Sequence, residues 1–198
     1  MNYLAHLHLG GSRPEQLLGS LYGDFVKGPL KGEYHEDIEK AIDLHRRLDG
    51  FTDRHPLLKT ARNRFSPELM RYSGIVLDMF FDHCLARHWQ DYSSTPLPHF
   101  TQKVYHLLLD QPQLPGRLEQ MAPYMIADDW LGSYRDFTVI RRSLAGISRR
   151  LGQPGLLDYF WPQLVKEYDF LTQDFHALYP ELQEFAHNHP SVQQEART

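Results

Sequence analysis

The sequence contains a single cysteine, lacks any long apolar run and carries little excess charge, and each absence excludes a class of protein. A lone cysteine, Cys84, forms no internal disulfide, which favours a reducing compartment. No apolar stretch approaches the roughly 20 residues that a membrane helix needs, and the first residues lack the features of a signal peptide. A net charge of −4 gives no general attraction to nucleic acid. We therefore expect a soluble, cytoplasmic protein that binds neither membranes nor nucleic acid.

The alternation of apolar and polar residues that is typical of strands is also nearly absent, apart from a hint in residues 4–9. Apolar residues recur instead at helical spacing, which predicts an all-α fold. The expected helices cover about residues 13–24, 36–51, 67–86 and 99–109, with two or three more in 117–150 and 155–187. We expect one compact helical bundle over residues 1–188, followed by a frayed polar tail at 189–198.

Two carboxylates lie in the most apolar of these helices. Asp78 and Asp82 are four residues apart, so they lie on one helix face within Gly74–Ala86. Two unpaired carboxylates in an apolar interior are strongly destabilising, and a bound cation turns them into ligands. The neighbouring His83 does not point to the same ion on a straight helix. It either binds an ion beyond the helix end or orients another ligand.

Two other segments place polar groups on apolar faces. Asp24 ends the first expected helix, while His45 and Asp49 lie in the middle of the apolar face of the second. His6 joins them if the N-terminal segment is helical. Carboxylates favour Mg²⁺ or Mn²⁺, and imidazole shifts the preference toward Mn²⁺, Fe²⁺ or Zn²⁺. A buried network of salt bridges to arginines such as Arg46 is the alternative interpretation.

The chemistry that fits such a metal site is hydrolysis of a phosphoester. The sequence has no cysteine nucleophile in a reactive setting, no serine triad and no phosphate-binding loop of the P-loop or Rossmann type. Metal-activated water is then the natural nucleophile. Arg46, next to the acidic groups, is placed to hold a phosphate by a forked contact.

Four blocks of this sequence resemble the acyl carrier protein phosphodiesterases of Gram-negative bacteria. The blocks are MNYLAHLHL at residues 1–9, GDFVKG at 23–28, LHRRLDGFTD at 44–53 and LDMFFDH at 77–83. The resemblance runs in order and spacing to about residue 185. It implies an all-helical fold distantly related to the HD phosphohydrolases. It also implies a Mn²⁺-preferring enzyme that cuts the phosphodiester between 4′-phosphopantetheine and a serine of holo acyl carrier protein.

The resemblance also implies the site residues. The expected metal ligands are Asp24, His45, Asp78, Asp82 and His83. The expected catalytic or phosphate-handling groups are Arg46, Asp49 and Asp53. His6 is added to them from its position in the N-terminal segment and not from the resemblance.

A carrier-protein substrate requires a basic docking surface, because carrier proteins of this kind are small and strongly acidic. One candidate patch comprises Arg54, Arg62, Arg64 and Arg71, with Lys59 nearby. The other comprises Arg141, Arg142, Arg149 and Arg150. The alternative for either patch is an ordinary charged surface that contacts only solvent.

Two other functions remain open from the residues. One is a related phosphohydrolase that acts on a nucleotide, which needs stacking aromatics such as Tyr22, Phe25, Phe81 and Trp89. The other is a non-catalytic helical interaction protein whose inward acids form salt bridges.

Overall fold

Helices form all the regular structure in residues 1–193, which are the residues described by this computed structural model. The α-helices are α1 (Tyr3–Leu9), α2 (Pro14–Tyr22), α3 (Glu36–Arg54), α4 (Pro56–Arg62), α5 (Ser73–Arg87), α6 (Leu97–Leu109), α7 (Leu118–Ala127), α8 (Trp130–Ser133), α9 (Phe137–Arg150), α10 (Phe160–His187) and α11 (Pro190–Gln193). Short 3₁₀ turns cover Pro67–Tyr72, Trp89–Asp91 and Leu156–Tyr159. The predicted all-α single domain is therefore confirmed.

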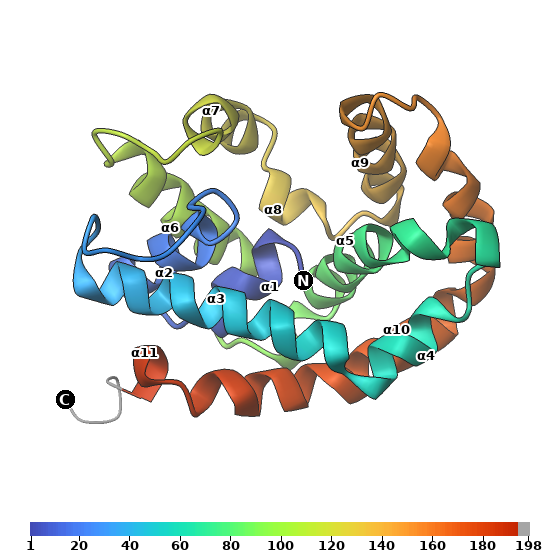
Figure 1. Cartoon of the computed structure of the whole chain (residues 1–198), viewed down its shortest axis with the longest axis horizontal. Coiled ribbons are helices and arrows are strands. Elements are labelled where there is room, and N and C mark those ends of the chain that lie inside the picture. The colour runs from blue at the N-terminus through green and yellow to red at the C-terminus, as the bar shows by residue number, and fades with distance from the viewer. Residues whose placement is uncertain (194–198) are drawn as a thin grey trace.

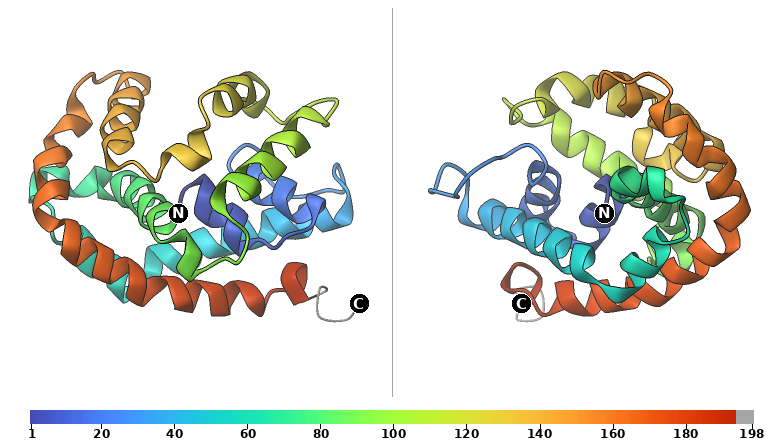
Figure 2. Two further views of the ribbon diagram at one scale, coloured as in Figure 1. Left: turned by 180° about the vertical axis from the view of Figure 1, so that it is seen from behind. Right: turned by 45° about the vertical axis from the view of Figure 1, so that its right-hand side comes forward.

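Helix α5 lies at the centre of the bundle because it is apolar on nearly every side (Figure 1). Helices α1, α4, α9 and α10 all contact it. The long helix α10 curves along one side of the molecule, and α7, α8 and α9 form the opposite side (Figures 1 and 2). The N-terminus lies near the centre, beside α5, so the first residues of the chain belong to the interior (Figure 1).

Two local expectations differ from the structure. The alternating residues 4–9 are part of helix α1, which is buried on several sides at Leu4, Ala5 and Leu7. The helix expected from Pro67 starts as a 3₁₀ turn, and regular α-helix begins only at Ser73.

The expected frayed tail is partly ordered. Residues 190–193 form α11, where the main-chain oxygen of Ser191 accepts a 2.6 Å hydrogen bond from Gln16 Nε2. The rest of the expected tail, residues 194–198, lies outside the described residues.

None of the helices in residues 1–193 is both long and apolar enough to cross a membrane.

Candidate metal centre

Two histidines and one aspartate meet where α1 crosses α3. Each oxygen of Asp49 faces one imidazole: Oδ1 lies 3.0 Å from His6 Nε2, and Oδ2 lies 3.5 Å from His45 Nε2. The two imidazole rings stack with centroids 3.7 Å apart. We call His6, His45 and Asp49 the central cluster. Their candidate ligand atoms lie within 4.8 Å of one another, which is close enough to share one metal ion.

A glycine at the end of α2 makes room for this cluster. A Cβ atom on Gly23 would lie 2.2 Å from Cγ of His45, so no larger residue fits without moving the imidazole. The close approach places Asp24, the next residue, beside His45, with Oδ1 of Asp24 3.9 Å from His45 Nε2. The sequence Gly23-Asp24 therefore brings a carboxylate to the cluster from the end of a third helix, α2.

Asp78 approaches the cluster from α5. Its Oδ1 accepts a 2.9 Å hydrogen bond from the amino group of Met1, which also lies 3.7 Å from Asp49 Oδ1. The side chains of Asp24, Asp49 and Asp78 are 40%, 44% and 36% exposed, whereas His6 and His45 are buried. The imidazoles thus form the floor of the site, and the carboxylates face solvent where a substrate can reach them.

The hydrogen bonding of His45 fits a bound cation. His45 Nδ1 donates to the main-chain oxygen of Ser20 over 2.7 Å, so Nε2 of a neutral His45 carries the lone pair. That lone pair faces oxygens of Asp24 and Asp49, which repel it unless a cation lies between them. Among residues 1–193, no hydrogen-bond partner reaches the buried His6 Nδ1. Two nitrogens with carboxylate oxygens make a donor set for Mn²⁺, Fe²⁺ or Zn²⁺.

The protonation states of the cluster also favour metal binding. Burial and the neighbouring His45 lower the pKa of His6 to about 3, so His6 is neutral at pH 7. Burial opposes ionisation of Asp49, but the hydrogen bond from His6 and the nearby amino group of Met1 hold its pKa well below the usual range. A neutral imidazole and an ionised carboxylate are the forms that bind metal ions.

Asp82 and His83, predicted as ligands, lie outside the central cluster. Asp82 is fully buried and accepts hydrogen bonds from the main-chain amides of Leu4 (2.8 Å) and Ala5 (3.1 Å). These amides, at the start of α1, stabilise a carboxylate that the sequence pattern predicted to be a metal ligand. His83 Nδ1 donates to Tyr134 O, which leaves Nε2 to accept from the Tyr168 hydroxyl, both over 2.8 Å. A neutral His83 therefore has no free lone pair.

Arg46 and Asp53 also lie away from the cluster. The guanidinium of Arg46 does make a forked contact, but to the main-chain oxygens of Gly28 and Val26, each at 2.8 Å. It thereby holds the loop that follows Asp24. Asp53 is exposed and pairs with Arg62 over 2.9 Å.

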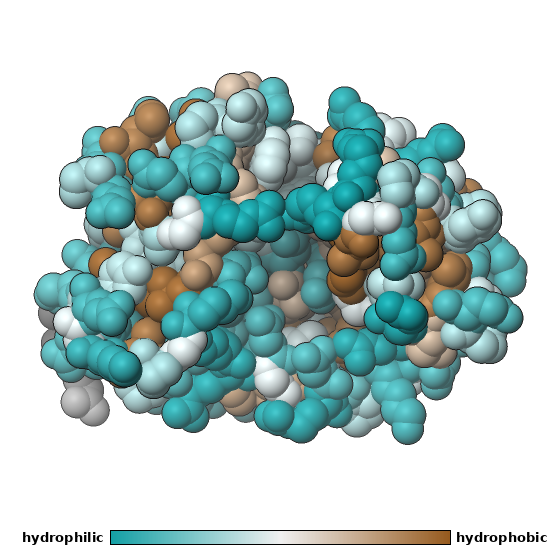
Figure 3. All heavy atoms as spheres, turned by 45° about the horizontal axis from the view of Figure 1, so that its top comes forward, coloured by the Kyte–Doolittle hydropathy of each residue, from teal (hydrophilic) through white to brown (hydrophobic). Residues whose placement is uncertain are grey.

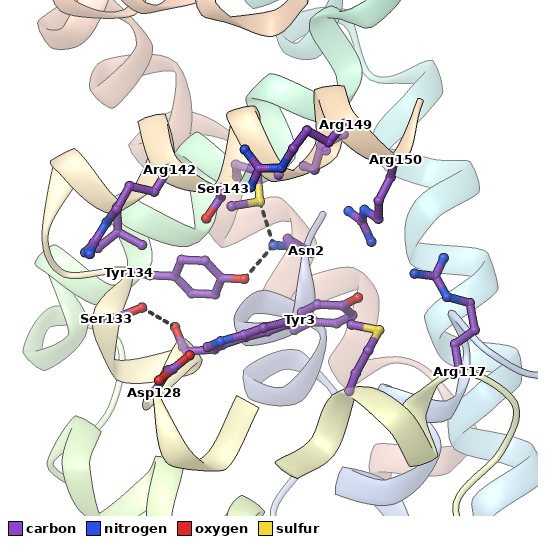
Figure 4. Close-up of a pocket in the computed structure, with 16 residues that line it drawn as sticks. Asn2, Tyr3, Arg117, Asp128, Ser133, Tyr134, Arg142, Ser143, Arg149 and Arg150 are labelled. Atoms are coloured by element: carbon purple, nitrogen blue, oxygen red, sulfur yellow. Dashed lines mark hydrogen bonds between the residues drawn. The ribbon is translucent and has the colours of Figure 1, made fainter. Parts of the chain in front are cut away.

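A pocket beside the cluster was not foreseen from the sequence. It has a volume of about 790 Å³ and lies between α7, α8, α9 and the first residues of the chain. Figure 3 shows the hollow on this face of the molecule. Inside the pocket, Asn2 Nδ2 donates a 2.8 Å hydrogen bond to the hydroxyl of Tyr134 (Figure 4). Residues from five separate segments form this lining, so no local sequence pattern marks it.

The first predicted docking patch is partly neutralised within the chain. Arg62 pairs with Asp53, Arg64 binds Asp174 over 2.8 Å, and Arg71 lies over the ring of Tyr72. Of the aromatics proposed for a nucleotide, Tyr22, Phe81 and Trp89 are core residues, and the partly buried Phe25 stacks on Tyr3.

Comparison with known proteins agrees with the resemblance in the sequence. A family model described as acyl carrier protein phosphodiesterase matches residues 1–182. A relative of that name from Serratia proteamaculans (strain 568) is 37% identical over 188 residues, covering 94% of this chain and 97% of its own. Another from Yersinia pestis is 38% identical over 182 residues, covering 91% and 94%.

No solved structure matches this chain, so the expected relation to HD phosphohydrolases stays a prediction. The match to the family model, by contrast, covers most of the chain and includes every residue of the central cluster. The chain belongs to the acyl carrier protein phosphodiesterase family.

Proposed function

We propose that this protein is a metal-dependent hydrolase that removes 4′-phosphopantetheine from a serine of holo acyl carrier protein. Family membership supports the substrate, and the relatives' name gives the reaction as phosphodiester cleavage. The observation that carries the metal dependence is the central cluster, in which His45 Nε2 faces two carboxylates. We propose that His6, His45 and Asp49 hold the ion, with Asp24 and Asp78 as flanking ligands or bases.

A bound divalent cation would supply Lewis acidity toward water and a phosphoryl oxygen. The residues around it hold the ion and accept a proton. Burial raises the pKa of Asp24, which makes this half-exposed carboxylate a better base than an ordinary aspartate. In the reaction the oxygen of water attaches to phosphorus, and Asp24 takes one of its protons. The bond from phosphorus to the serine oxygen breaks and that oxygen is protonated, giving apo carrier protein and free 4′-phosphopantetheine.

Mn²⁺ is the proposed ion, with Mg²⁺, Fe²⁺ and Zn²⁺ as the other candidates. Two imidazole ligands favour a metal softer than Mg²⁺. The carboxylate ligands favour Mn²⁺ over ions that prefer nitrogen or sulfur ligands. Metal analysis of the purified protein, followed by reconstitution of the metal-free protein with each ion, distinguishes these candidates.

Mass spectrometry of the carrier protein tests the function directly. Holo carrier protein is incubated in three reactions: with wild type and Mn²⁺, with wild type and EDTA, and with the control variant Asp49→Asn and Mn²⁺. We expect loss of the phosphopantetheine group only in the reaction of wild type with Mn²⁺. An unchanged carrier protein in all reactions contradicts the proposed substrate, and equal cleavage in EDTA contradicts the metal.

A further inference from the structure

Four arginines surround the pocket beside the central cluster. Arg117 precedes α7, and Arg142, Arg149 and Arg150 come from α9 on the other side of the pocket. All four are exposed. In Figure 4 the side chains of Arg117 and Arg150 extend toward one another across the opening. We call these four residues the arginine rim.

The rim has little compensating charge of its own. Within residues 1–193, no carboxylate forms an ion pair with any of its members. Asp136 acts on Arg142 electrostatically, and Asp128 lines the pocket away from Arg117 and Arg150 (Figure 4). This differs from Arg62 and Arg64 of the other patch, whose guanidinium groups already bind carboxylates. The rim is therefore free to receive anionic groups.

Tyr3 connects this pocket to the central cluster. Its side chain lines the pocket and is influenced electrostatically by Asp24 on one side and by Arg150 and Arg117 on the other. Its ring stacks on Phe25, the residue after Asp24, with centroids 6.2 Å apart. Tyr3 is thus within electrostatic range of both the positive rim and Asp24 of the candidate metal centre.

We infer that the arginine rim is the docking surface for an acidic protein face, and that the pocket receives the arm of that protein while the phosphodiester at the root of the arm lies beside Tyr3, at the cluster. This inference rests on the proposed function. Charge complementarity selects the partner: exposed arginines around an opening suit the carboxylates of a protein surface, which remain outside while one slender arm enters. A volume of about 790 Å³ is sufficient for such an arm, but not for a folded domain.

Charge reversal on two surfaces tests the inference. The rim variant carries Arg149→Glu and Arg150→Glu. The competing variant carries the same change of charge on the other patch, Arg54→Glu and Arg71→Glu. For holo carrier protein, we expect the rim variant to raise KM about tenfold or more, with kcat within about twofold of wild type. We expect the competing variant to keep KM within about threefold. Hydrolysis of bis(p-nitrophenyl) phosphate, which has no protein to dock, stays equal in both. Equal KM values in the rim variant and wild type overturn the inference.

A binding measurement separates this inference from the proposed reaction. The affinity of labelled holo carrier protein is measured at low and high salt for Asp49→Asn, alone and combined with the rim substitutions. The inference requires that the rim substitutions weaken binding and reduce its dependence on salt. If wild type cleaves nothing but the rim still governs binding, the proposed function fails and the docking surface stands. If cleavage occurs and the rim has no effect on affinity, the docking surface fails alone.

Discussion

At the level of single residues, the structure shows three ways of compensating a polar group in an apolar interior. His83 uses two neutral partners, Tyr134 and Tyr168. Asp82 uses two main-chain amides. His45 has one such partner, the main-chain oxygen of Ser20, and its Nε2 faces the carboxylates of Asp24 and Asp49, which is where a cation would bind.

Substitution of the two histidines separates these roles. We expect His45→Gln to lower turnover and metal affinity about 100-fold or more, since even an outer partner of a ligand is worth about 10–100-fold. His83→Gln should keep turnover within about fivefold and lose about 1–3 kcal/mol of stability through its two hydrogen bonds. Activity assays, metal titration and urea unfolding measure these effects. Comparable loss of metal affinity in both variants would return His83 to the ligand set.

At the level of helices, the site depends on how closely α1, α2 and α3 approach. Gly23 allows α2 to end against the ring of His45. The amides at the start of α1 bind Asp82 on α5, which fixes where His6 lies. The candidate site is thus assembled from three helices whose contacts have nothing to do with the metal itself.

Two glycine substitutions test the packing of α2 on α3. Gly23→Ala should displace the imidazole of His45 and weaken metal binding, because the new Cβ would lie 2.2 Å from Cγ of that ring. Gly50→Ala is the control: it lies beside Asp49 on α3, and its Cβ would lie no nearer than 3.5 Å to the flexible end of Arg54. We expect Gly50→Ala to keep metal affinity and gain up to about 1 kcal/mol in stability. Metal titration and thermal unfolding decide between steric and general effects.

The contact of α1 with Asp82 predicts a pH dependence. Burial raises the pKa of Asp82 from 3.8 to about 7, against the hydrogen bonds from Leu4 and Ala5. Between these values the folded protein binds more protons at this group than the unfolded chain, so its contribution to stability falls as pH rises. The unfolding free energy of wild type minus that of Asp82→Asn should therefore decrease from about pH 4 to pH 7. Urea unfolding across this range measures it, and a difference that grows with pH contradicts the prediction.

At the level of the whole molecule, the site joins elements from distant parts of the chain. The cluster uses α1 and α3, Asp78 comes from α5, and the arginine rim comes from α7 and α9. A metal ion bound at the cluster therefore links helices that must separate when the protein unfolds.

Metal binding should consequently raise the melting temperature. An ion that binds only the folded protein, present at 100 times its Kd, stabilises by about 2.7 kcal/mol. For a chain of this size this corresponds to a rise of about 5–11 °C. Calorimetry with Mn²⁺ and with EDTA measures the shift, with His45→Gln as the control that should show none. The same shift in that variant would place the ion elsewhere.

Much of this architecture follows from local sequence. Apolar residues at helical spacing predict the helices because that period is a property of a few neighbouring turns. The wide apolar surface around Asp78 and Asp82 indicates the buried central helix. The motif blocks of residues 1–83 indicate the family, which comparison confirmed. His45, predicted on the apolar face of an amphipathic helix, is buried, whereas Asp49, predicted on the same face, is 44% exposed.

Only the tertiary structure decided which of these groups meet. Asp78 and Asp82 share a helix face, but the start of α1 docks its amides on Asp82 and leaves Asp78 near the cluster. Arg64 pairs with Asp174, 110 residues away, which reduces the free charge of the patch favoured from the sequence. Helical periodicity depends on neighbours in the chain and was determined by the sequence alone. Charge compensation depends on whichever donor or acceptor is packed alongside, and distant segments supply that only once the helices have assembled.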